Sequence, residues 1–162
     1  MGVQSARDRQ HLPLHLAGPG RVSGVTDVLV VEDNPADIEL MRVTLEDLAL
    51  PHHLDWVPDG EAALAYLRSF TPRLVLLDLN MPRLGGLEVL HAVRDERLGE
   101  FVVVVFSSSA AEQDRQAALA LGAAAHVVKP ASFDAFCEVF AEVLLTYAPL
   151  PANGHGERSI GS

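Results

Sequence analysis

Polar side chains with chemical potential directly follow four apolar runs of this sequence. Glu32 and Asp33 follow VLVV, Asp78 follows RLVLL, Ser107 follows FVVVVF, and Lys129 follows AHVV. Taken singly, each residue has an ordinary structural explanation as a helix cap, a turn or a solvated charge. Four such strand ends in one chain instead predict a shared polar site.

Three of these side chains are carboxylates, and carboxylates held close together repel one another. A cation would relieve the repulsion between Glu32, Asp33 and Asp78, and ligands that are all oxygen favour Mg²⁺ or Mn²⁺ over zinc. A carboxylate beside such an ion can act as a nucleophile and form an acyl phosphate. The pattern therefore predicts phosphoryl chemistry assisted by a metal.

The hydroxyl and the ammonium fit the same chemistry. A transferred phosphoryl group carries negative charge on three oxygens, and the metal, Ser107 and Lys129 can each hold one of them. Lys129 is the only lysine, and every other Lys/Arg position is arginine. Lysine is a compact charge on a flexible stem, whereas arginine is a broad planar fork. A crowded pocket that holds a metal would accept only the lysine.

The elements that must position these residues alternate between about residues 25 and 148. Asn34, Asp59 and Ser132 predict helix N-caps, and Ser109 with Glu112 has the spacing of a capping box. Each of five expected strands is followed by a helical pattern. The strands are expected at 26–31, 53–57, 73–77, 101–106 and 125–128.

Three of the expected strands are continuous Val and Leu runs, which are typical of strands buried on both faces of a parallel sheet. Five strands alternating with five helices predict a doubly wound α/β sandwich of three layers. Ligands of such sheets bind beyond the carboxyl ends of the strands, where the polar residues fall. The strand at 53–57 ends in Pro58 and is expected at an edge.

Composition limits the class of protein. With 162 residues, of which 49% are hydrophobic, the chain fits one globular domain, expected at 25–148 between flexible segments at 1–24 and 149–162. The net charge of −10 argues against binding to nucleic acid or anionic lipid. No apolar run reaches the roughly 18 residues of a membrane helix. One cysteine, Cys137, excludes an internal disulfide and favours a cytoplasmic location.

Five motifs, in the same order, resemble the receiver domain of response regulators, the CheY-like family. They are VLVVEDNPAD, PDGEAAL, LVLLDLNMPRLGG, VVVVFSSS and AAAHVVKP. The resemblance implies a flavodoxin-like (βα)5 fold with strand order 2-1-3-4-5. It also implies a signalling protein rather than an enzyme, which accepts a phosphoryl group from a sensor histidine kinase.

The resemblance assigns roles to individual residues. Asp78 would be the phosphoacceptor. Glu32 and Asp33 would bind Mg²⁺ together with Asp78, and the backbone carbonyl of Asn80 would be a further ligand. Ser107 would supply the switch hydroxyl.

Around the lysine the resemblance implies three further features. Lys129 would contact the phosphoryl group, and Pro130 after it is commonly preceded by a cis peptide in this family. His126 stands where receivers often carry a switch tyrosine or phenylalanine. A histidine there fits either a pH-sensitive switch or a simple partly buried side chain.

A narrower resemblance is to stand-alone receivers that pair with phytochrome-type histidine kinases. It rests on VEDNPADIEL, LLDLNMPRLGG, RDERLGEF and the triple serine. The residues after the last expected helix are too few for an effector domain. The output is therefore expected to be a contact with a downstream protein or onward phosphotransfer.

Other functions remain open from the residues alone. A phosphohydrolase with an aspartyl nucleophile would need an acid two residues later, where Asn80 cannot donate a proton as an acid would. A receiver-like module that signals without phosphorylation would not need the intact polar set. The glycine cluster GPGRVSG at 18–24 precedes a strand, so it fits no nucleotide or flavin loop.

The last expected helix carries two apolar stripes. The first is expected to face the core and consists of Phe133, Phe136, Cys137, Phe140 and Leu144. The second consists of Val139, Val143 and Tyr147. It fits a homodimer face or a wide core face equally well.

Overall fold

The structure is a computed structural model that describes residues 26–150. Five parallel strands alternate with five helices along the chain. The elements are β1 (Thr26–Val31), α2 (Pro35–Asp47), β2 (His52–Val57), α3 (Gly60–Ser69), β3 (Leu74–Leu77), α4 (Gly86–Glu96), β4 (Val102–Ser107), α5 (Glu112–Ala120), β5 (Ala125–Val128) and α6 (Phe133–Tyr147). The expected strands are confirmed, with bounds that differ by at most one residue at each end.

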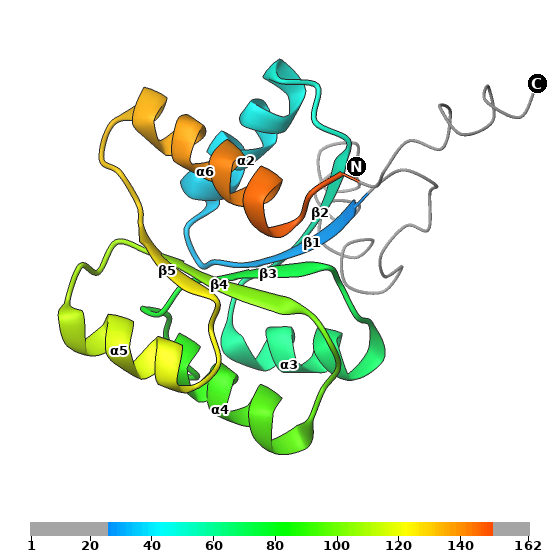
Figure 1. The fold of residues 1–162 in the computed structure, drawn as a ribbon, viewed down its shortest axis with the longest axis vertical. Coiled ribbons are helices and arrows are strands. Elements are labelled where there is room, and N and C mark those ends of the chain that lie inside the picture. Colours follow the sequence, from blue (N-terminus) through cyan, green and yellow to red (C-terminus); the bar gives the residue numbers. More distant parts are fainter. Residues whose placement is uncertain (1–25, 151–162) are drawn as a thin grey trace, which may run out of the picture.

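The strands form one sheet in the order β2-β1-β3-β4-β5, with every pairing parallel. This confirms the predicted flavodoxin-like topology and the edge position of β2. Helices α2 and α6 cover one face of the sheet, and α3, α4 and α5 cover the other (Figure 1). The order reverses between β1 and β3, which opens a crevice at their carboxyl ends.

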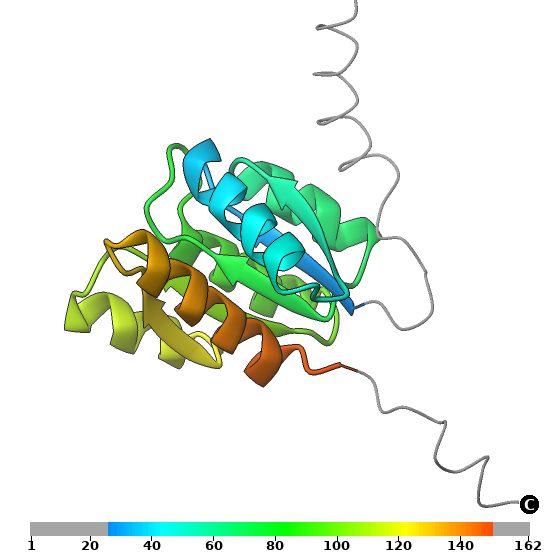
Figure 2. The ribbon, with the colours of Figure 1, turned by 90° about the horizontal axis from the view of Figure 1, so that it is seen from above.

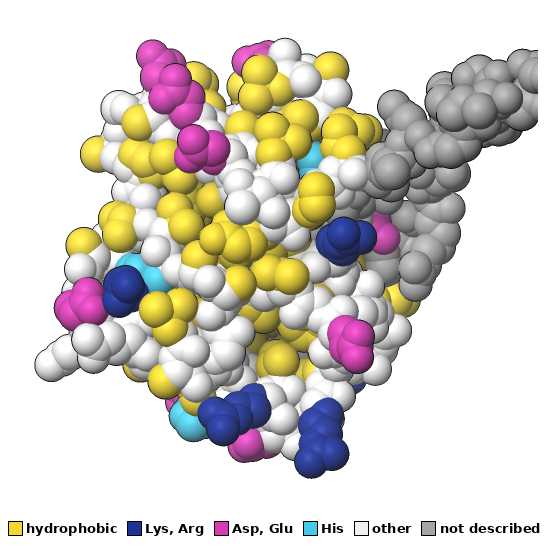
Figure 3. Space-filling model, viewed as in Figure 1, with side chains coloured by type: hydrophobic (Ala, Val, Ile, Leu, Met, Phe, Trp, Pro, Cys, Tyr) yellow, Lys and Arg dark blue, Asp and Glu magenta, His cyan; other side chains and the backbone are white. Residues whose placement is uncertain are grey.

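The core lies on both faces of the central strands because their side chains alternate in direction. On β1, Leu29 and Val31 pack with α3, α4 and α5, whereas Val28 and Val30 pack with α2 and α6. Hydrophobic side chains run along the middle of the molecule between the two helix layers (Figure 3). Two-sided burial explains why these strands have continuous apolar sequences.

Three of the predicted helix caps are confirmed. Asn34, Asp59 and Ser132 each accept a hydrogen bond from a backbone N–H in the first turn of α2, α3 and α6. The predicted capping box at α5 is wrong, because Ala111 occupies the N-cap position. The Ser109 hydroxyl instead donates to Asp114 Oδ2 at 2.7 Å.

Most of the first apolar stripe of α6 lies in the core, as predicted. Phe136, Phe140 and Leu144 are buried as predicted, but Phe133 is 55% exposed. Phe133 is the first residue of α6 and lines an open pocket with Thr44, Asp47 and Leu48. Cys137 is half-buried.

The second stripe of α6 is part of a wide core face. Val143 is buried, and Val139 and Tyr147 pack against the same cluster. Figure 2 shows α2 and α6 side by side, and α6 also packs against side chains of the sheet, so it buries a broad arc. The stripe itself therefore gives no support to a dimer face.

Within residues 26–150, no helix is both long enough and apolar enough to cross a membrane. The segment expected at 1–24, the glycine cluster inside it and most of the tail expected at 149–162 lie outside the described residues.

Candidate functional site

The carboxyl ends of β1 and β3 bring the three predicted carboxylates together. Val31 pairs with Leu77, so Glu32 and Asp78 leave neighbouring strands at the same level. One oxygen from each of Glu32, Asp33 and Asp78 lies within 4.8 Å of the others. Glu32 and Asp78 are buried, whereas Asp33 is exposed. The predicted convergence of these residues is confirmed.

The backbone and side chain of Glu32 are held from several directions. Its N–H donates to Val57 O at 3.1 Å, and its carbonyl accepts from Trp56 Nε1 at 2.6 Å. The N–H of Asn34 donates to Glu32 Oε2 at 3.1 Å. Strand β2, which was predicted only to lie at an edge, therefore positions an acidic residue of the site.

Asp78 is placed at the end of β3 by its own backbone and by the loop that follows. Its N–H donates to Val31 O at 3.1 Å, and its Oδ1 accepts from Asn80 N–H at 3.3 Å. The first residue of α4, Gly86, packs so closely that a Cβ there would lie 2.5 Å from Asp78 O. The glycine allows α4 to begin directly beneath the site.

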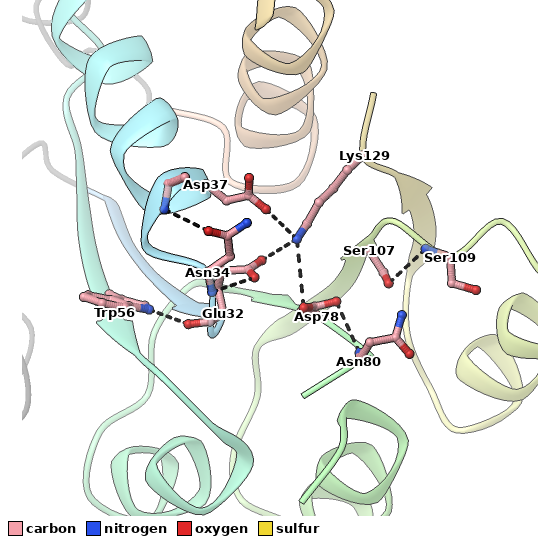
Figure 4. A network of polar contacts seen from close by, with 10 residues as sticks. Glu32, Asn34, Asp37, Trp56, Asp78, Asn80, Ser107, Ser109 and Lys129 are labelled. Carbon is pink, nitrogen blue, oxygen red and sulfur yellow. Dashed lines mark hydrogen bonds and ion pairs between the residues drawn. The ribbon is translucent and has the colours of Figure 1, made fainter. Parts of the chain in front are cut away.

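The ammonium of Lys129 lies among three carboxylates (Figure 4). Its Nζ is 2.5 Å from Glu32 Oε1, 2.8 Å from Asp37 Oδ2 and 3.9 Å from Asp78 Oδ2. The Lys129 side chain is only 9% exposed. A compact charge on a flexible stem fits this space, in agreement with the reason predicted for the lone lysine.

Asp37 is the residue of this network that the sequence analysis missed. A carboxylate in the first turn of a helix is ordinarily explained by the helix dipole. The chain separates Asp37 from Lys129 by 92 residues. Lys129 follows β5 and its side chain reaches the first turn of α2, so the contact exists only in the folded chain and no local pattern signals it.

Burial and the neighbouring charges shift the pKa values of Glu32 and Lys129 in opposite directions. Burial raises the pKa of Glu32 to about 7, although the nearby Lys129 ammonium works against that rise. Burial lowers the pKa of Lys129, but hydrogen bonds to Asp37 and Glu32 outweigh it and leave that pKa above its usual value. The buried acidic cluster thus stabilises positively charged groups that lie close to it.

The donor set fits a hard divalent cation. The cluster offers only oxygen ligands, which suit Mg²⁺ or Mn²⁺. Two of its carboxylates are buried, where a negative charge without a cation is unfavourable. The cluster opens into a cavity of about 360 Å³. Its lining residues are Glu32, Asp33, Asn34, Asp37, Asp78, Asn80, Ser108, Lys129 and Phe136.

Ser107 ends β4 and is fully buried. Its hydroxyl accepts a hydrogen bond from Ser109 N–H at 3.3 Å, and its carbonyl accepts from Lys129 N–H at 2.9 Å. The second bond ties the end of β5 to β4. Ser107 therefore stands at the predicted sheet edge with its oxygen already in a local hydrogen bond.

Two predicted residues near the lysine differ from the family pattern. All peptide bonds of the described residues are trans, so a cis bond before Pro130 is wrong for this structure. The trans form is the lower in energy before proline, by about 0.5–1 kcal/mol. His126 is half-buried, and its Nε2 is buried without a hydrogen-bond partner among the described residues.

Comparison with known proteins identifies relatives of this arrangement. Residues 28–141 match the response regulator receiver domain family. Over 114 residues the chain is 39% identical to the probable methanogenesis regulatory protein FilR2 of Methanothrix harundinacea. That alignment covers 66% of this chain and 74% of the relative.

Solved structures of similar fold include two response regulators. The phosphorylated cyanobacterial phytochrome response regulator RcpA aligns with a TM-score of 0.70 and 30% identity, covering 78% of this chain and 99% of that one. The Mn²⁺-bound form of Rcp1, a response regulator of Synechocystis, aligns with a TM-score of 0.69 and 30% identity, with the same coverage of both chains.

Proposed function

Because the chain belongs to the family of response regulator receiver domains, we propose that it accepts a phosphoryl group on Asp78. Such domains act in two-component signalling and are generally not enzymes. The observation that carries the assignment is the placement of Asp78 between Lys129 and Asn80, beside two more carboxylates and an open cavity. We place the protein in the cytoplasm, which its single cysteine supports.

The proposed donor is a phosphohistidine of a sensor histidine kinase. An oxygen of the Asp78 carboxylate attacks phosphorus, and an O–P bond forms as the N–P bond of the donor breaks. The electron pair of the broken bond stays on the imidazole nitrogen, and the product is an acyl phosphate. A phytochrome-type kinase is our candidate donor, because RcpA, a cyanobacterial phytochrome response regulator, is similar over 78% of this chain.

The acidic cluster would supply the metal ligands. We propose that Glu32, Asp33 and Asp78 hold Mg²⁺ or Mn²⁺, with the backbone carbonyl of Asn80 as a further ligand. When bound, such an ion neutralises charge on the phosphoryl oxygens and helps to orient them.

Lys129 and Ser107 would hold the remaining phosphoryl oxygens. The Lys129 ammonium is 3.9 Å from Asp78 Oδ2, within a small side-chain movement of a group attached there. A hydroxyl that accepts one hydrogen bond still has a proton to donate, so Ser107 can bind phosphate while it accepts from Ser109. His126 lies three residues before Lys129 on β5 and would respond to movement at this end of the sheet.

The proposed output is a shift between two conformations. The phosphoryl group makes contacts with Ser107 and Lys129 that the free protein lacks, so it favours the state in which those contacts form. The changed surface would then engage a downstream protein or pass the phosphoryl group onward.

Mass spectrometry of the intact protein tests the acceptor. After incubation with a small acyl-phosphate donor and Mg²⁺, the wild type should gain one phosphoryl group, and EDTA should prevent the gain. Asp78→Asn should keep the fold and gain none. Asp47→Asn removes an exposed carboxylate at the far end of α2 and should behave like the wild type. A phosphoryl group on Asp78→Asn would contradict the assignment, and rapid phosphate release without an adduct would favour a hydrolase.

A further inference from the structure

Asp37 stands apart from the three clustered carboxylates. It lies in the first turn of α2, which the Asn34 cap and Pro35 begin. Its backbone N–H donates to Asn34 O at 3.1 Å, so the residue is held within the helix rather than in a loop. Its side chain is 17% exposed and bonds Lys129 Nζ at 2.8 Å. The carboxylates that lie within 4.8 Å of one another do not include it.

Lys129 and a metal ion would compete for the same oxygen atoms. The ammonium bonds Glu32 and approaches Asp78, and both residues are proposed metal ligands. A divalent ion in the cluster would repel an ammonium so close to its ligands. The proposed function nevertheless needs both cations in the site at once. The ammonium therefore needs an anion that the ion does not use, and Asp37 meets that requirement.

We propose that Asp37 is a positioning residue, which retains the Lys129 ammonium when a metal ion takes Glu32 from it. The inference rests on the proposed function of the site. With Asp37 present, the lysine can move away from Glu32 and still remain within reach of Asp78. Without Asp37, its charge is balanced only by the carboxylates that the ion requires.

The contact is shielded enough to act in this way. The side chains of Lys129 and Asp37 are 9% and 17% exposed, so water weakens their attraction much less than that of a surface pair. Among the described residues, the other hydrogen-bond partner of the ammonium is Glu32. Loss of Asp37 should thus strengthen the hold of Lys129 on the metal ligands.

Calorimetric titration of the full chain with Mg²⁺, without any phosphodonor, tests this proposal. Asp37→Asn should weaken Mg²⁺ binding by at least about five-fold, the lower end of typical coupling between sites. Asp37→Glu should recover part of the loss. Glu39→Gln removes an exposed carboxylate two residues further along α2 and should leave Mg²⁺ binding within about two-fold of the wild type.

A double-mutant cycle separates a role through Lys129 from a general loss of negative charge. In a Lys129→Met background, Asp37→Asn should change Mg²⁺ affinity by no more than about two-fold. An equal weakening in both backgrounds, or none in either, would overturn the proposal. The wild type, the two single variants and the double variant of the cycle are first compared by circular dichroism. If Asp37→Asn does not fold, Asp37→Ala replaces it.

The proposed function and this inference fail in distinguishable ways. If the wild type binds Mg²⁺ and is phosphorylated on Asp78 but the cycle is additive, only the role of Asp37 is overturned. If the wild type neither binds Mg²⁺ nor gains a phosphoryl group, the proposed function fails and the role of Asp37 fails with it. If the cycle is non-additive but no phosphoryl group is gained, the coupling between Asp37 and Lys129 is supported and the phosphoacceptor is not.

Discussion

Lys129 places one positive charge among carboxylates that directly follow β1 and β3 or lie on α2, and the shape of its side chain makes this possible. Three rotatable N–H donors on one nitrogen can face Glu32, Asp37 and Asp78 from a single point. A guanidinium spreads its donors over a plane and favours paired bonds with one carboxylate. The side chain is 9% exposed, so there is little room to turn such a plane.

Lys129→Arg should therefore keep the fold and lose the response to phosphorylation. The larger side chain should lower the free energy of unfolding by about 1–3 kcal/mol, as overpacking does elsewhere. Backbone amide NMR spectra with and without an acyl-phosphate donor measure the response. Asp78→Asn is the control that cannot respond. If the spectrum of Lys129→Arg changed as the wild-type spectrum does, the shape of the lysine side chain would not be required for the response.

The site residues that could be predicted from the sequence are those that follow strands directly. Glu32, Asp33, Asp78 and Lys129 converge because parallel strands end at one edge, and that rule needs no knowledge of side-chain packing. Asp37 follows no such rule, because its contact depends on how the Lys129 side chain reaches the first turn of α2. The peptide bond before Pro130 is trans, whereas the family resemblance implied a cis bond.

Helix α4 illustrates how an element positions the site. Gly85 and Gly86 are neighbours, but their surroundings differ. A Cβ on Gly86 would lie 2.5 Å from Asp78 O, whereas one on Gly85 would approach no atom closer than 3.3 Å. Only the second glycine is required for the close approach of α4 to the loop that carries Asp78.

Gly86→Ala should destabilise the protein although alanine favours helices. The clash with the Asp78 carbonyl should cost about 1–3 kcal/mol, the usual range for overpacking. Gly85→Ala is the matched control and should change the free energy of unfolding by less than about 1 kcal/mol. Urea denaturation of both variants measures the difference. Equal stability of the two would mean that the loop relaxes without cost.

Strand β2 and helix α3 are joined by a polar network at the sheet edge. Buried Asp55 accepts from Tyr66 Oη at 2.5 Å and lies 3.0 Å from His53 Nε2. The hydrogen bond to Asp55 raises the pKa of His53, although partial burial works against the rise. A raised histidine pKa means that the folded state favours the protonated ring.

The stabilisation from His53 should be complete below pH 6.5 and should disappear as pH rises through the higher pKa of the folded state. Because the His53 side chain is 38% exposed, its contribution should stay below about 1 kcal/mol. Thermal unfolding of wild type and His53→Gln at pH 6 and pH 8.5 measures it. The unfolding temperature of the wild type should exceed that of His53→Gln by more at pH 6 than at pH 8.5. A constant difference would exclude protonation as the cause.

At the scale of the whole molecule, the alternation of strands and helices determines the fold, and clustered charged side chains form the candidate site. Continuous Val and Leu runs predicted a sheet covered on both faces, and the two core clusters confirm it. The contacts of α6 were less predictable, because tertiary packing leaves Phe133 exposed and brings the second stripe into the core. The molecule carries a net charge of −10 and gathers three carboxylates at one edge of its sheet.

Mg²⁺ should therefore stabilise the entire fold. An ion that binds only the folded state should add about 2.7 kcal/mol to the free energy of unfolding at a concentration 100 times its Kd. Asp33→Asn should gain much less, because one proposed ligand is missing. Thermal unfolding with MgCl₂, against NaCl of equal ionic strength, measures the gain. An equal gain in both salts would indicate general screening and no specific site.

The hydrogen bond from Trp56 to the carbonyl of Glu32 has an optical consequence. Trp56 is the only tryptophan in the chain, and its indole nitrogen lies 2.6 Å from the backbone of an acidic site residue. Any change that repositions Glu32 alters the electric field at this one chromophore. Trp56 is thus a native fluorophore beside the acidic cluster, and stopped-flow emission should time the proposed ion binding and phosphorylation without an attached dye.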